Sequence, residues 1–211
     1  FHLGANLYYM DYDNQLVLTG KISEIGEPLT SNIKDSYRMG VELSGGVRLA
    51  PWLDWSGHVT LSSNKIRCFT EYVDTYDKDG NVLPQTVNEL GTTDIAFSPN
   101  VTFGSTFDVR WRGFTAALMS SYVGRQYLDN TSALERSIDP YFVSDLRVGY
   151  AFHPRFMKEI ALDVSIRNLF NAEYESGGWT YSSIQDGRRS TSSGYFAQAT
   201  RNFMARLTLK F

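Results

Sequence analysis

The chain has 211 residues, a formal net charge of −3, 42% hydrophobic residues and 14% aromatic residues. This composition is that of a folded chain, and without a basic excess it gives no support for a nucleic-acid partner. The single cysteine, Cys68, excludes a disulfide framework within the chain. No run approaches 18 consecutive apolar residues, which excludes a transmembrane helix but leaves a transmembrane β-barrel possible, because barrel strands alternate.

Apolar and polar residues alternate with a period of two along most of the chain, as in strands whose successive side chains point to opposite faces. The clearest stretch is 95–111, where odd positions such as Val101 and Phe103 are apolar and most even positions are polar or small. Read as one strand, this stretch of 17 residues would reach about 55 Å. It is longer than the ~9–11 residues that a strand needs to cross a bilayer. No stretch has a helical period. We therefore predict eight strands, near 3–19, 35–50, 53–68, 91–112, 113–128, 140–152, 159–174 and 196–211.

The connections between these expected strands alternate in length. In a simple up-and-down meander, alternate connections lie at the same end, so the short turns gather at one end and the long loops at the other. Bacterial outer-membrane barrels have this asymmetry, with aromatic residues near both bilayer interfaces. The short connections are expected at 50–52, 112–113 and 153–158, and the long ones at 20–35, 70–93, 129–140 and 175–195.

The alternation also gives each residue an expected side of the barrel wall. Six apolar residues are expected to face lipid at mid-membrane: Val101, Phe103, Leu162, Val164, Leu207 and Leu209. Nine charged or titratable residues fall on the opposite side and are expected to face the barrel interior: Arg38, Glu42, His58, Asp108, Arg110, Arg147, Asp163, Arg167 and Arg206.

No motif of catalysis or metal binding stands out. The three histidines are far apart in sequence, and neither a G-x-S-x-G segment nor a glycine-rich phosphate loop occurs. The segment 77–81 is similar to a calcium loop, but Thr75 and Thr86 stand where that loop requires carboxylates. We expect no catalytic residue, no metal and no cofactor.

The long loops carry aromatic and cationic side chains. Such side chains suit large, partly apolar or anionic ligands, through stacking and charge-assisted hydrogen bonds; packing of loop against loop is the alternative. Two glycines before Trp179 predict an exposed ring on a mobile mount. The expected ligand-binding residues are Tyr72, Tyr76, Tyr127, Tyr174, Trp179, Tyr181, Arg188 and Arg189.

Two segments resemble the TonB-dependent outer-membrane receptors. Residues 168–174, N-L-F-N-A-E-Y, are similar to an N-L-F-[ND]-x-x-Y segment near the C-terminus of these receptors. Residues 201–211 resemble their last strand, whose terminal aromatic, here Phe211, is read by the barrel-assembly machinery. The resemblance implies a 22-stranded barrel in the bacterial outer membrane, of which residues 1–211 form the last eight strands. The plug domain and the TonB box of the family are then expected outside this chain.

The resemblance also implies a function, which is TonB-energised uptake of a scarce solute such as a siderophore, haem, cobalamin or a sugar chain. The implied partners are the lipid bilayer, the remaining barrel strands, the plug and TonB, with the interior charged residues meeting the plug or water. The alternative is a self-contained eight-stranded outer-membrane barrel with a surface, anchoring or small-channel role. Small interior residues such as Gly40, Ser44 and Gly104 would leave so narrow a barrel unfilled, which favours the receptor. A barrel-embedded hydrolase and a soluble β-sandwich with a binding role are two further hypotheses.

Overall fold

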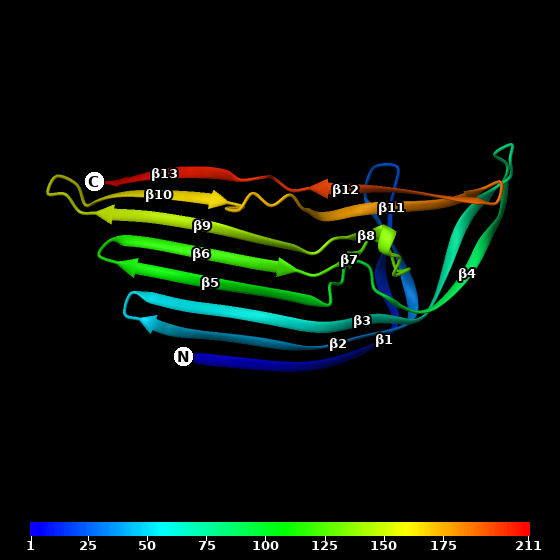
Figure 1. Ribbon diagram of the computed structural model, residues 1–211, viewed down its shortest axis with the longest axis horizontal. Coiled ribbons are helices and arrows are strands. Elements are labelled where there is room, and N and C mark those ends of the chain that lie inside the picture. The colour runs from blue at the N-terminus through cyan, green and yellow to red at the C-terminus, as the bar shows by residue number, and fades with distance from the viewer.

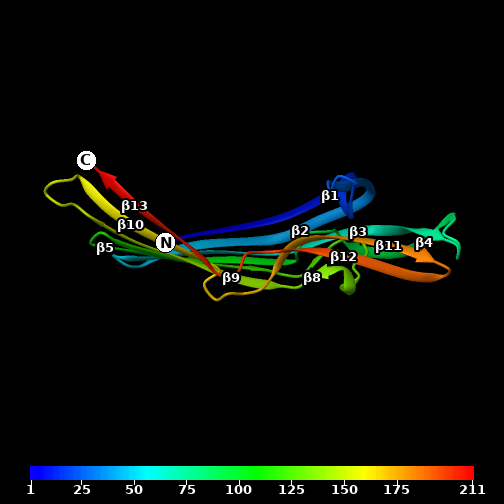
Figure 2. The ribbon, with the colours of Figure 1, turned by 90° about the horizontal axis from the view of Figure 1, so that it is seen from above.

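A long, curved antiparallel sheet makes up most of the chain in the computed structural model, which describes residues 1–211 (Figures 1 and 2). Eight strands follow one another as neighbours in the order β1-β2-β3-β5-β6-β9-β10-β13, so the predicted all-β meander is confirmed. The sheet is not closed, because β1 and β13 lie at its two edges and each has one neighbour on this path. These strands are β1 (His2–Ile22), β2 (Pro28–Ala50), β3 (Leu53–Tyr76), β5 (Val101–Trp111), β6 (Phe114–Val123), β9 (Tyr141–Phe152), β10 (Glu159–Arg167) and β13 (Asn202–Lys210).

Five further strands lie off this path, all toward the end with the long connections (Figure 1). A single 3-10 turn, η1 (Leu134–Arg136), is the only helical element, and none of the helical structure is long or apolar enough to cross a membrane. The five strands are β4 (Val82–Asp94), β7 (Gln126–Tyr127), β8 (Ser137–Ile138), β11 (Glu175–Gln185) and β12 (Arg188–Ala197).

The strand register separates a polar face of the sheet from an apolar face. Residues directly opposite each other in an antiparallel pair share a face. Leu162, for example, lies opposite Leu207 on one side and Tyr150 on the other, whereas Asp163 lies opposite Arg206 and receives hydrogen bonds from it at 3.0 and 3.2 Å. By this register all nine residues expected in the barrel interior share one face, and all six residues expected to meet lipid share the other.

The short connections gather at one end of the sheet and the long ones at the other, as the sequence predicts (Figure 1). Between β5 and β6, Arg112 and Gly113 both have positive φ, at 48° and 83°. This conformation makes a tight two-residue hairpin whose twist matches the flanking strands. Near the other end, Phe103 packs on Tyr122 with ring centroids 5.5 Å apart, which places aromatic rings on the apolar face close to the long connections.

The prediction of one strand over 91–112 is wrong. The chain breaks between β4 and β5, where Phe97 has a φ of 52° and its amide donates to the carbonyl of Tyr127 at 2.9 Å. Ile95 is buried in a small core with Val17 of β1 and Ile66 of β3, so its apolar character reflects packing inside the protein rather than contact with lipid. Strands longer than a bilayer requires are nevertheless present, since β3 has 24 residues.

Three of the predicted long loops are hairpins instead. In 20–35, β1 continues to Ile22 and β2 begins at Pro28, with only a turn at 23–27 between them. The segment 70–93 continues β3 outward and returns as β4, and 175–195 forms β11 and β12. Asp186 and Gly187 close the β11–β12 hairpin with φ values of 48° and 72°. The end of β11 then pairs in parallel with the end of β3, with Ser183 opposite Asp74. The β11–β12 hairpin is thereby fixed over the end of the sheet (Figure 1).

The predicted strands 159–174 and 196–211 are both shorter in the structure, because Asn168 turns the chain after β10. Asn168 has a φ of 52° and is 3% exposed. Its side-chain amide donates to the carbonyls of Ala172 at 2.8 Å and Ala199 at 3.2 Å, and its side-chain oxygen accepts from the amide of Ala172 at 2.8 Å. One side chain therefore joins the end of β10 to the segment that leads into β13.

We expect Asn168→Ala to destabilise the last two strands by about 1–3 kcal/mol, because it leaves buried backbone groups without partners in a left-handed position. Asn168→Gly keeps the backbone conformation and should cost less than the alanine variant. Chemical unfolding of the full-length protein measures both. Equal losses in the two variants would show that the left-handed backbone contributes nothing.

The two faces predict opposite responses to a new charge in the full-length protein. Leu162→Arg places a cation on the apolar face, where contact with mid-membrane lipid costs about 2–4 kcal/mol. Ser165→Arg places the same cation on the polar face of the same strand and is the matched control. A membrane-assembly assay should show a larger loss for Leu162→Arg, and equal losses would contradict the assignment of faces.

Candidate functional site

A cavity of about 310 Å³ lies where the β11–β12 hairpin, the long end of β3 and the β6–β9 connection meet. Most of its lining is polar. It is formed by residues of β1, β2, β3, the β6–β9 connection and β11: Thr19, Lys21, Ser31, Asn32, Ile33, Phe69, Thr70, Glu71, Tyr72, Val73, Asp129, Asn130, Thr131, Arg136, Thr180 and Ser182.

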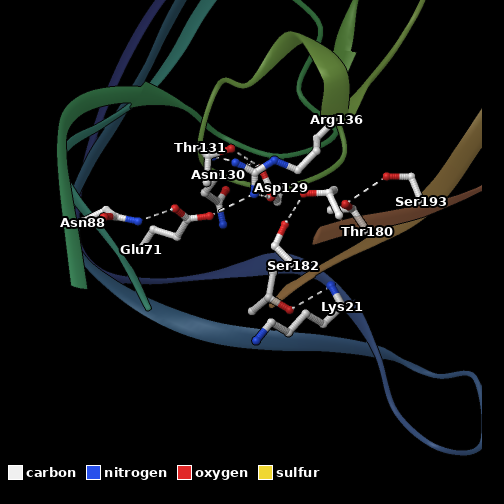
Figure 3. A network of polar contacts seen from close by, with 12 residues as sticks. Lys21, Glu71, Asn88, Asp129, Asn130, Thr131, Arg136, Thr180, Ser182 and Ser193 are labelled. Carbon is white, nitrogen blue, oxygen red and sulfur yellow. Dashed lines mark hydrogen bonds and ion pairs between the residues drawn. The ribbon is translucent and has the colours of Figure 1, made fainter. Parts of the chain in front are cut away.

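Glu71 is the centre of the polar contacts beside this cavity (Figure 3). Its carboxylate accepts hydrogen bonds from Arg136 at 2.9 Å, from both terminal nitrogens of Arg189 at 2.5 and 3.1 Å, and from Asn88 at 3.1 Å. The side chains of Glu71 and Arg136 are only 10% and 6% exposed. One carboxylate thus connects β3, β4, β12 and the β6–β9 connection.

Asp129 holds Arg136 from the other side. Its carboxylate accepts from the Arg136 guanidinium at 2.7 Å and from the amide and hydroxyl of Thr131 at 3.0 and 2.6 Å. The next residue, Asn130, accepts from the amide of Ala96 and donates to the carbonyl of Leu18, both at 2.8 Å. The connection is therefore anchored to β1 and to the β4–β5 break, and it presents Arg136 in a fixed position. The Nε of Arg136 is buried without a partner.

The β11–β12 hairpin covers the cavity with hydroxyl groups. Thr180 accepts a hydrogen bond from Ser193 at 3.0 Å, and the hydroxyls of Ser182 and Thr191 are 2.9 Å apart. On the neighbouring side, Lys21 lies 3.8 Å from Asp74, and Tyr181 donates to Asp74 at 3.2 Å. Polar groups of this hairpin are therefore tied to β3 at two places, through Asp74 and through Glu71.

The pKa of Glu71 follows from these contacts. Burial alone would raise it, but the hydrogen bonds from Arg189, Arg136 and Asn88 outweigh burial and lower the pKa from 4.5 to about 2. Glu71 is therefore ionised at neutral pH, which a buried carboxylate requires partners to achieve.

The structure brings only some of the eight expected ligand-binding residues together. Arg189 binds Glu71, and Tyr72 lines the cavity. Tyr76 and Tyr181 lie where β3 and β11 pair, since Tyr181 contacts Asp74 and the carbonyl of Tyr76 accepts from the amide of Asp186.

The other expected residues lie apart from the cavity lining. The ring of Tyr174 packs on Tyr141 with centroids 4.6 Å apart, Tyr127 belongs to the small β7–β8 sheet, and Arg188 is exposed at the hairpin turn. The prediction of a mobile mount for Trp179 is wrong, because the glycines before it lie within β11. Its ring packs over Gly194, where an added Cβ would lie 2.4 Å from the indole nitrogen.

Sequence reasoning missed the charged centre of the site, namely Glu71, Asp129 and Arg136. These residues lie in segments that it treated as loops, and no spacing in the sequence relates residue 71 to residue 136. One local signal was available for the covering hairpin, because Asp-Gly at 186–187 is a strong two-residue hairpin turn.

Comparisons with known proteins identify the barrel. The family described as "TonB dependent receptor-like, beta-barrel" matches residues 1–169, whereas no curated protein matches the chain. Three similar solved structures are the ferric-catecholate import receptor Fiu from E. coli K12 (17% identity, TM-score 0.62), the ferric yersiniabactin uptake receptor FyuA from Yersinia pestis (16%, 0.59) and the siderophore receptor PiuA from Acinetobacter baumannii (15%, 0.62). The alignments cover 99%, 96% and 99% of this chain, but only 25%, 26% and 26% of those receptors.

The lowered pKa of Glu71 predicts a pH-dependent opening of the hairpin. The ion pairs stabilise the closed arrangement fully above pH 4.5 and are lost as the pH falls from 4.5 through about 2, because the open form takes up a proton first. The protection factors of residues 179–185 against hydrogen exchange should therefore decrease as the pH is lowered over this range. Glu71→Gln is the control, since it removes this titrating group. Its protection should be lower and should change less with pH, and the remaining change belongs to Asp74, whose pKa is also lowered, chiefly by the hydrogen bond from Gln85.

Proposed function

Because the chain belongs to the TonB-dependent receptor-like β-barrel family, we propose that it forms part of the barrel wall of an outer-membrane receptor that imports a scarce solute with energy from TonB. The observation that carries this proposal is the eight-stranded meander, which aligns over nearly its whole length with about a quarter of each solved receptor. The family is one of transport receptors, and we infer no catalytic role.

The two edges of the sheet support a place within a larger barrel. A membrane-spanning sheet must satisfy its backbone hydrogen bonds internally, and so it has to close. On the eight-strand path β1 and β13 are each paired on one side only and not with each other, so nothing favours a self-contained eight-stranded barrel. We propose that further strands, a plug domain and a TonB box belong to the same receptor, that these eight strands are the last of 22, and that Phe211 serves assembly.

The polar and apolar faces support an orientation in this barrel. We propose that Val101, Phe103 and Leu207 meet lipid, while Arg147, Arg167 and the other charged residues of the polar face meet the plug or water. Several interior charges already have partners in the sheet. Glu42, for example, accepts from Asn6 at 3.1 Å, and Arg38 donates to Asn64 at 3.2 Å.

The cavity under the β11–β12 hairpin supports capture of the solute at the outer end of the barrel. Tyr72 lines it, and Arg189 binds Glu71 of its lining, so that aromatic and charged groups lie at its wall. The related structures bear names that refer to ferric-catecholate, ferric yersiniabactin and siderophores. We propose a solute of this general kind, a siderophore, haem, cobalamin or a comparable scarce compound, for this receptor.

A topology experiment tests the proposal in bacteria that carry the full-length receptor. Gly80 lies at the tip of the β3–β4 hairpin with open space around it, and Pro154 lies in a turn at the opposite end. An epitope inserted at Gly80 should be labelled on intact cells. The same epitope inserted after Pro154 should be labelled only after the outer membrane is permeabilised. Labelling of both epitopes on intact cells, or of neither after permeabilisation, would contradict a membrane-spanning wall with this orientation.

A further inference from the structure

Charged side chains around the cavity balance one another. The cations are Lys21, Arg136 and Arg189, and the anions are Glu71, Asp74 and Asp129. Resting on the proposed role of this cavity in solute capture, we infer that Glu71 is a specificity-determining residue that excludes anionic groups and reserves the cavity for uncharged, hydrogen-bonding parts of the solute.

The position of Glu71 makes this exclusion effective. Its two oxygens occupy the donors of Arg136 and Arg189 that would otherwise bind a phosphate, sulfate or carboxylate. The carboxylate is 10% exposed, so an entering anion cannot displace it into water without breaking the hydrogen bond from Asn88 as well. An anion beside an ionised Glu71 and Asp129 would meet two like charges in a site of low dielectric constant.

The groups left free in the cavity suit an uncharged partner. Ser31, Thr70 and the hydroxyl of Tyr72 line the cavity without a side-chain hydrogen bond of their own. Phe69 and Tyr72 add aromatic surface at the same wall. Hydroxyl or amide groups on a partly apolar frame match this lining.

Removing the charge of Glu71 should convert the cavity into an anion site. Glu71→Gln keeps the size of the side chain and an oxygen acceptor, but it leaves Arg189 without a counter-ion and Arg136 with Asp129 alone. The change frees a forked set of N–H donors, which is the geometry that binds oxyanions best.

Isothermal titration calorimetry of the purified full-length receptor with pyrophosphate tests the inference. The wild-type protein should show no saturable binding of pyrophosphate up to about millimolar concentration. Glu71→Gln should bind pyrophosphate with a Kd at least about ten-fold below that limit. Glu24→Gln is the matched control, because it removes one negative charge from an exposed position at the same end of the molecule and should behave as wild type. The double variant Glu71→Gln/Arg189→Ala should lose the gain.

Two results would overturn the inference: saturable binding of pyrophosphate by the wild-type receptor, or no gain in Glu71→Gln. An equal gain in Glu24→Gln would also count against it, since the effect would then be one of net charge. The measurement needs neither TonB nor transport. A failure here with correct epitope topology therefore leaves the receptor assignment intact.

Discussion

Interstrand hydrogen bonding of the backbone is the constraint on which the rest of this structure depends. In the hydrocarbon core of a bilayer no water is available, so each strand must find both of its neighbours within the protein. The meander satisfies this requirement for six of its eight strands, from β2 to β10. The edge strands β1 and β13 each have one neighbour on this path and lack the second. This geometry and the family assignment therefore both indicate a larger closed barrel.

Outside the hydrocarbon core this constraint is weaker, because water can satisfy backbone groups, and side-chain contacts determine how the segments are arranged. The β11–β12 hairpin is joined to the outward part of β3 by only a short parallel ladder, in which Ser183 lies opposite Asp74. Their arrangement depends instead on buried ion pairs around Glu71. A carboxylate with three donor side chains is stable only while all of them stay in place, so the removal of one partner leaves an unpaired buried charge. The same contacts that close the hairpin also neutralise the cavity beneath it.

Much of the wall could be predicted from the sequence. Alternation along 101–111, 141–152 and 159–167 gave the strands and the two faces, because a period of two in a sheet is imposed by the backbone itself. Alternation misled where it continued through Ile95 and Phe97, since burial against β1 and β3 selects the same apolar residues as lipid does. Asn168 ended a predicted strand early because its side chain, rather than a neighbouring strand, satisfies the backbone.

The site could be predicted only in part. Aromatic and cationic residues in loops pointed correctly to Tyr72 and Arg189 as neighbours of the cavity. Glu71, Asp129 and Arg136 come from separate segments, and their pairing depends on how a connection folds back against β3. Such contacts between distant segments follow no period, and a single sequence holds no signal for them.

Nitroxide scanning of residues 202–210 in the full-length receptor tests the central claim most directly. Spin labels report lipid contact through access to oxygen, and contact with the polar interior through access to a water-soluble nickel complex. We predict access to oxygen at odd positions such as Leu207 and access to nickel at even positions such as Arg206, because the register places these residues on opposite faces of β13. A uniform profile, or an alternation of opposite phase, would contradict a barrel wall whose apolar face meets the membrane.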